Sequence, residues 1–163
     1  MFVTTWRLEA PIEPVWNVIH DLERWPTWWK GLECAVRLKP GDENGEGSVW
    51  RLTWKGPLAY RLAFDLCVTR VERPVALEGT ARGELEGTGR WQLSHQGPVT
   101  RVGYIWTVHT TKNWMNWLAP LARPLFEWNH NLVMQQGAEG LARLLNARLL
   151  QFRGEEPEPT SSG

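Results

Sequence analysis

The sequence predicts an α+β domain in which a curved antiparallel sheet wraps a long C-terminal helix and encloses a hydrophobic cavity. Residues 33–111 follow a hydrophobic period near two, and residues 113–152 then return to a helical period. The chain of 163 residues also contains 12 Trp, against 2 Tyr and 4 Phe. Trp has a large flat apolar body with one donor, so this excess predicts an unusually wide interior that indoles fill or line.

Two elements are expected before the period-two region. Phe2–Glu9 is predicted to be a strand, because β-branched and aromatic residues are frequent in it. Pro14 suits the first turn of a following helix, whose apolar face is formed by Val15, Val18, Ile19 and Leu22. The next segment, 24–31, holds at most one short helical turn and brings together Trp25, Trp28 and Trp29.

Six strands are predicted in the middle of the chain. Short segments rich in Gly, Pro, Asp and Asn separate them, and such turns join antiparallel neighbours. The predicted strands are 33–39, 48–55, 59–71, 75–85, 88–95 and 100–111. A single sheet of this size is expected to curl, which leaves a hollow between the sheet and a covering helix.

The C-terminal part is predicted to be helical. Asn113 suits a helix N-cap, and the helical period runs from there to about Phe152. Pro120 and Pro124 are expected to break the first turns, so that the main helix begins near 120–123. Residues 1–152 are therefore predicted to form one domain, and residues 153–163 a disordered acidic tail.

Short motifs accompany this order of elements. They are Pro11–Trp16 leading to His20 and Asp21, Trp25–Trp29, Glu86–Trp91, and Thr100–Tyr104 before the last helix. Over residues 1 to about 150, the chain resembles the START/Bet v1-like superfamily (SRPBCC), also called the polyketide cyclase/dehydrase and lipid-transport family. The resemblance implies a helix-grip fold around a hydrophobic cavity. Members bind lipids, hormones or polyketides, and only some of them are enzymes.

Alternation within the strands predicts which side chains face the cavity. The inward sets are Val102, Tyr104, Trp106 and Val108; Leu62, Phe64, Leu66 and Val68; Trp50, Leu52 and Trp54; and Trp91 with Leu93. Cys67 is expected to point outward. The strand 75–85 places Gly79, Ala81 and Gly83 inward, and these small residues either open room for a ligand or let the sheet bend sharply.

One stripe of the C-terminal helix is predicted to face the sheet. Its members are Leu118, Leu121, Leu125, Leu132 and Val133, with Asn129 and Gln136 among them. A buried amide without a hydrogen bond is unfavourable, so Asn129 is predicted to orient a polar group of a bound molecule. His130 lies at the border of the stripe and is expected to pack or cap rather than catalyse.

The composition and charge of the chain indicate which kinds of partner, metal site and cellular location to expect. Lys and Arg total 18, as do Asp and Glu, and no long single-sign run occurs, so no nucleic-acid partner is expected. Two cysteines and the absence of a metal-ligand His spacing predict no metal and no cofactor. No stretch approaches the ~20 apolar residues of a membrane span, and the first residues lack a secretory pattern, so a cytoplasmic protein is expected.

The predicted function is binding of a hydrophobic small molecule, such as a lipid, a polyketide or a polycyclic aromatic, in a Trp-rich cavity between sheet and helix. The residues predicted to contact it are Trp28, Trp50, Trp54, Phe64, Trp91, Tyr104, Trp106, Leu125 and Asn129.

Other interpretations stay open at this point. The resemblance allows a polyketide aromatase/cyclase or dehydratase that acts on a poly-β-keto chain, with Tyr104 and Asn129 polarising a carbonyl. Against it, the inward strand sets contain no charged side chain for acid–base catalysis. The segment Trp25–Trp29 is alternatively a lid over the cavity or an exposed patch that grips a protein partner. A further alternative is that the tryptophans only fill the hydrophobic core and line no cavity. The sequence leaves the oligomeric state open.

Overall fold

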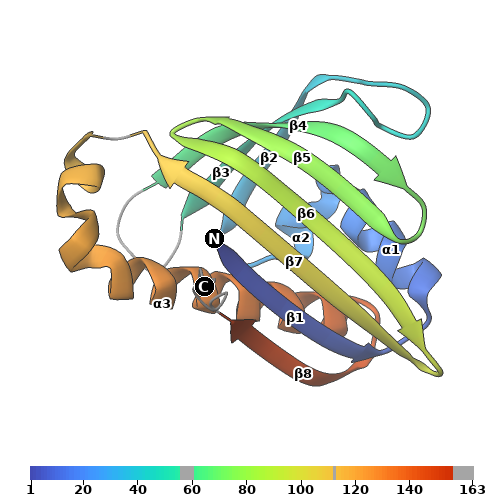
Figure 1. Cartoon of the computed structure of the whole chain (residues 1–163). Helices are drawn as coiled ribbons and strands as arrows, with labels where there is room; N and C mark the ends of the chain where they lie inside the picture. Colours follow the sequence, from blue (N-terminus) through green and yellow to red (C-terminus); the bar gives the residue numbers. More distant parts are fainter. Residues whose placement is uncertain (56–60, 112, 156–163) are drawn as a thin grey trace, which may run out of the picture.

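The computed structural model describes residues 1–55, 61–111 and 113–155, without the side chains of residues 114–116, 118, 119, 121, 122 and 155. An eight-stranded sheet curves around α3 (Asn113–Leu144), as Figure 1 shows. Three short elements, α1 (Ile12–His20), the 3-10 helix η1 (Leu22–Arg24) and α2 (Trp25–Trp28), follow the first strand. The predicted α+β class is confirmed, with a curved sheet on a C-terminal helix.

All neighbouring strands in the sheet are antiparallel, in the order β2-β3-β4-β5-β6-β7-β1-β8. The strands are β1 (Phe2–Glu9), β2 (Leu32–Lys39), β3 (Val49–Lys55), β4 (Arg61–Glu72), β5 (Ala76–Gly83), β6 (Leu85–Gln96), β7 (Val99–Thr110) and β8 (Arg148–Glu155). The seven strands predicted from the sequence are confirmed, with shifts at their ends.

The sequence analysis does not predict the eighth strand, because the helical period continues to about Phe152. Asn146 adopts a left-handed conformation with φ of 49°, and the N–H of Ala147 donates to the carbonyl of Ala142 at 2.9 Å. This is the hydrogen-bond pattern that ends a helix at a left-handed residue. β8 then pairs with β1 and includes 153–155, which were assigned to the tail. Residues 156–163 lie outside the described residues.

Pro120 and Pro124 were expected to break the first turns of the C-terminal helix, but α3 continues through both. Pro120 and Pro124 lie inside it, and its first turns stand at an angle to the rest beyond the edge of the sheet (Figure 1). A proline lacks the N–H donor and crowds the preceding turn, so it bends a helix that continues through it. Only the later turns of α3 therefore lie along the concave face.

The buried face of α3 differs from the predicted stripe. Its C-terminal half buries small residues and Leu141, with Ala138 and Leu141 fully inaccessible. Leu125 is 46% exposed, so its predicted inward position is wrong. The side chains of Leu118 and Leu121 lie outside the described set. The spacing of large aliphatic residues does not reveal this buried face, because the residues that pack closely there are glycines and alanines with little or no side chain.

Two glycines of α3 lie directly against α2. A Cβ at Gly140 would be 1.8 Å from the backbone oxygen of Trp28, and a Cβ at Gly137 would be 2.6 Å from the indole of Trp29. Trp25, Trp28 and Trp29 are 4%, 7% and 3% exposed. The interpretation of Trp25–Trp29 as an exposed protein-binding patch is therefore wrong, because α3 covers this segment.

Replacing Gly140 by Ala is expected to lower the free energy of unfolding by at least about 1 kcal/mol, because the helix must move away from a rigid backbone oxygen. Helix propensity alone predicts the opposite sign, a gain of about 1 kcal/mol. Urea unfolding distinguishes the two, with the exposed Glu139→Ala as control, which should change stability by less than about 0.5 kcal/mol. A stabilised Gly140→Ala protein would contradict the close contact.

Candidate ligand-binding cavity

A cavity of about 380 Å³ lies between the concave face of the sheet and α3. Inner side chains of β3 to β7 form one wall, in agreement with the alternation read from the sequence. Phe126, Val133 and Met134 from α3 form much of the other. The volume falls in the range of small-molecule pockets, which begins at roughly 300 Å³. The lining is predominantly apolar, so the cavity suits a hydrophobic molecule.

Six of the nine residues predicted to contact a ligand border this cavity: Trp54, Phe64, Trp91, Tyr104, Trp106 and Asn129. Trp28 is buried beside the cavity and stacks on Trp29, with ring centroids 5.2 Å apart. Trp50 is buried, and its Nε1 donates to the Ser48 hydroxyl at 3.1 Å. Leu125 faces solvent. These three predictions are therefore not supported by the geometry.

Trp29 closes the cavity toward α2 and links the sheet to the helix. Its indole N–H donates to the Val133 carbonyl at 2.8 Å, and its ring meets those of Trp54 and Trp91 edge-on at 5.1 and 6.0 Å. Trp6 packs behind it at 6.0 Å and is 1% exposed. The tryptophans therefore have two roles: some fill the core around α2, and others border the hollow that remains.

An aromatic stack forms the wall contributed by β6 and β7. Tyr104 stacks on Trp91 with centroids 4.1 Å apart, and lies 5.8 Å from Trp106. A Cβ at Gly89 would be 2.8 Å from the Trp106 ring, so this glycine makes room for the indole. Burial raises the pKa of Tyr104 above its ordinary value, so its phenol stays neutral.

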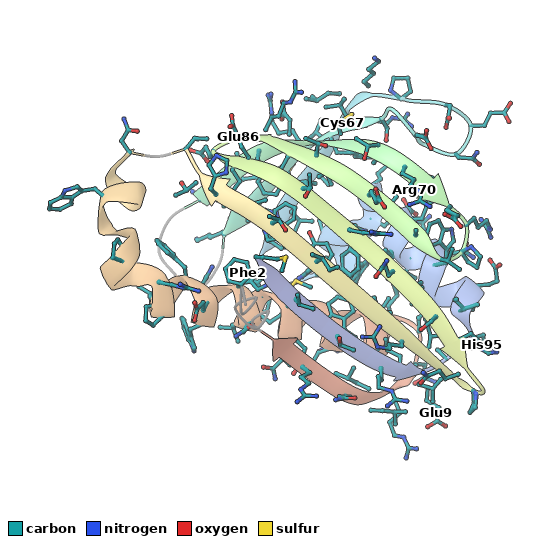
Figure 2. The ribbon with its side chains drawn as sticks, viewed as in Figure 1. Phe2, Glu9, Cys67, Arg70, Glu86 and His95 are labelled. Atoms are coloured by element: carbon teal, nitrogen blue, oxygen red, sulfur yellow. The ribbon has the colours of Figure 1, made fainter. Side chains whose placement is uncertain are left out.

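Two adjacent polar residues of α3 face this apolar space. Asn129 Oδ1 and His130 Nε2 are buried, and no hydrogen-bond partner for either lies in the described part of the chain. The His130 ring stacks on Phe2 with centroids 4.2 Å apart, and Figure 2 shows Phe2 at the start of β1, close to α3. The sequence places His130 at the border of the inward stripe, where it is expected to pack or cap rather than catalyse, and the structure places it in the cavity wall.

Charge is nearly absent from the cavity wall. Among the described lining residues there is no Lys or Arg, and the only carboxylate, Glu78, lies 3.1 Å from both Arg70 and Arg90. His109 also borders the cavity, with its side chain 71% exposed. No group of three or more His, Cys, Asp or Glu in the described ranges is placed to hold a metal ion. The site is therefore apolar, with neutral hydrogen-bonding groups.

Stability should depend on pH through His130. Burial, and secondly the positive N-terminus, lower the pKa of His130 to about 4. Between an unfolded pKa near 6.5 and this folded value, the unfolded chain holds a proton that the folded chain does not. Lowering the pH through this window should therefore cost up to about 3 kcal/mol of stability.

The variant His130→Phe keeps an aromatic ring against Phe2 but does not titrate. Urea unfolding at pH 7 and pH 4 should show a smaller loss for His130→Phe than for the wild type, since both retain the other histidines. An equal loss in the two proteins would show that His130 titrates normally.

Solved structures with the same fold share little sequence with this chain. A conserved protein from Geobacillus kaustophilus superposes with a TM-score of 0.74 at 10% identity, covering 96% of this chain and all (100%) of its own. A START superfamily protein from Mycobacterium smegmatis gives 0.67 at 15% identity, covering 89% and 97%. Zhui aromatase/cyclase from Streptomyces sp. R1128 gives 0.66 at 14% identity, covering 90% and 93%.

No curated protein matches the chain by sequence. Within the described residues, no helix has both the length and the hydropathy needed to cross a membrane. The family model for polyketide cyclase / dehydrase and lipid transport matches residues 2–146. This match confirms the resemblance seen in the sequence: the chain belongs to the polyketide cyclase/dehydrase and lipid-transport family, and its fold is shared with a START superfamily protein.

Proposed function

We propose that the protein binds an uncharged hydrophobic small molecule that carries a hydroxyl group. The observation that carries this proposal is the pair of unpartnered polar atoms, Asn129 Oδ1 and His130 Nε2, on an otherwise apolar cavity wall. A hydroxyl both donates and accepts, so it can satisfy the amide oxygen and either tautomer of the imidazole. Apolar burial would supply the affinity, and this hydrogen bond the orientation.

The wall chemistry disfavours an anionic ligand. A carboxylate buried here would meet Tyr104, Asn129 and neutral His130, but none of the described lining residues offers a cationic side chain. An unpaired buried charge costs several kcal/mol, far more than an unpaired hydroxyl. We therefore expect a neutral alcohol or phenol to bind in preference to a fatty-acid-like carboxylate.

A second candidate is a polyketide aromatase/cyclase or dehydratase. The neutral phenol of Tyr104 and the amide of Asn129 both border the cavity, and a hydrogen-bond donor can polarise a ketone of a poly-β-keto chain. The fold shared with an aromatase/cyclase agrees with this chemistry but does not assign it. Conversion of a poly-β-keto thioester that is lost in Tyr104→Phe, with hydroxyl-ligand binding retained, would favour the enzyme.

The ligand-binding domain is proposed to run from residue 1 through β8, because β8 pairs with β1 and so belongs to the same sheet. A cytoplasmic location and the lack of a nucleic-acid partner stay predictions from the sequence.

Calorimetric titration with 2-naphthol and 2-naphthoate tests the preference for a neutral ligand, because the two probes share one ring system and differ in charge. The wild type should bind 2-naphthol at least ~10-fold more tightly, as an unpaired buried carboxylate is costly. Asn129→Leu, which keeps the side-chain size, should weaken 2-naphthol binding by ~5-fold or more. Tighter binding of 2-naphthoate would contradict the proposed selectivity.

Removing the Trp106 indole tests the lining. Trp106→Ala should weaken 2-naphthol binding without unfolding the domain, because the ring borders the cavity at the end of the aromatic stack. Trp117→Ala is the matched control, since Trp117 is 82% exposed on α3. Equal affinities for the two variants would place the ligand elsewhere.

A further inference from the structure

A second hollow, of about 220 Å³, lies on the convex face of the sheet, across β7, β1 and β8. It is midway along β1, between Phe2 and Glu9, which Figure 2 labels near the two ends of that strand. Its lining is entirely polar: Thr5, Arg7, Gln96, Arg101, Gln151 and Arg153. The alternate residues of β1, such as Trp6, are buried on the concave side. The sheet therefore separates this hollow from the apolar cavity.

The register brings two arginines directly opposite each other. Arg7 of β1 faces Arg101 of β7, with Gln151 of β8 on the other side of Arg7. Like charges at opposed positions of neighbouring strands are destabilising. A bound group of opposite charge between the two arginines would offset this repulsion and stabilise the sheet.

These two arginines differ from several other arginines on the same sheet. Arg51, Arg61 and Arg148 each contact a carboxylate, at 2.8, 2.8 and 2.7 Å. Arg7 instead donates to Gln96 Oε1 at 2.8 Å, and Arg101 to Thr5 Oγ1 at 3.4 Å. Both partners are neutral, so the two positive charges are not compensated by a carboxylate of the described chain.

At least one donor at this hollow is left without an acceptor. Arg7 Nε is buried and has no hydrogen-bond partner in the described part of the protein. A guanidinium has five N–H donors, and the Gln151 amide adds two. Gly103 lies opposite Thr5 in the register, beside the Arg101 guanidinium.

We propose that this hollow binds a phosphate group, either as inorganic phosphate or as a phosphomonoester that includes a lipid headgroup. A phosphate dianion matches the two uncompensated guanidinium charges, and its several oxygens can accept from forks on two neighbouring strands. The site is independent of the hydrophobic ligand, because it lies on the other face of the sheet.

Titration of the full chain with inorganic phosphate tests the site. Calorimetry measures the binding, and NMR of the arginine Nε–H groups reports which arginines are affected. Phosphate should bind saturably and shift the Arg7 Nε–H signal. The double variant Arg7→Gln/Arg101→Gln should weaken phosphate binding at least ~10-fold. The control Arg82→Gln/Arg143→Gln removes the same charge at exposed positions elsewhere and should bind like the wild type.

Thermal unfolding separates a lost site from a lost fold. Without phosphate, the Arg7→Gln/Arg101→Gln protein should unfold at or above the wild-type temperature, since a like-charge pair is removed. Adding phosphate should raise the unfolding temperature of the wild type and of the control, but not of this variant. Undetectable phosphate binding, or equal binding by both double variants, would overturn the proposal.

The source of the phosphate is distinguished by two further probes. Phenyl phosphate tests a soluble monoester, and vesicles of phosphatidylcholine with and without phosphatidic acid test a lipid headgroup. Binding of phenyl phosphate with no preference for phosphatidic acid would assign a soluble ligand. A preference for phosphatidic acid that Arg7→Gln/Arg101→Gln abolishes would assign the headgroup. 2-Naphthol binding should be equal in all these variants.

Discussion

The contact between α3 and α2 determines where the molecule is filled and where it is hollow. Gly137 and Gly140 bring the helix against the backbone and indoles of Trp28 and Trp29, and Trp29 then joins Val133 to the sheet. This close packing fills the interior beside the C-terminal half of α3. Further toward its N-terminus, larger inward residues and the bend at the prolines keep the helix from packing equally tightly, and the cavity lies there.

The two faces of the sheet carry different chemistry because side chains alternate along each strand. On β1, Trp6 and Leu8 face the core, while Thr5 and Arg7 face outward. The concave side is apolar with neutral hydrogen-bonding groups, which suits an uncharged hydrophobic molecule. On the convex side, Arg7 and Arg101 at the second hollow donate to neutral partners only. The two proposed sites therefore lie on opposite faces of one sheet and differ in character.

Most of the sheet and much of its cavity wall could be predicted from the sequence, because one buried face imposes a strict alternation on strands such as β4 and β7. The helix was harder. Its buried face is defined by Gly137, Ala138 and Gly140, which a search for large aliphatic residues overlooks, so that search places Leu125 inward and His130 only at the border. Asn146 was the available signal for the end of α3, since Asn tolerates the left-handed conformation that closes a helix. Trp50 was misplaced for another reason: alternation gives the face of a strand but not the position along the sheet where packing ends and the hollow begins.

Organic extraction of the purified protein, with mass spectrometry of the extract and tryptophan emission before and after, tests most directly whether the cavity holds a ligand. A neutral hydroxyl-bearing hydrophobic molecule should be recovered, and its removal should change the emission, because Trp54, Trp91 and Trp106 border the cavity. An empty extract, with emission unmoved by neutral lipids and polycyclic alcohols, would contradict this and leave the tryptophans as core alone.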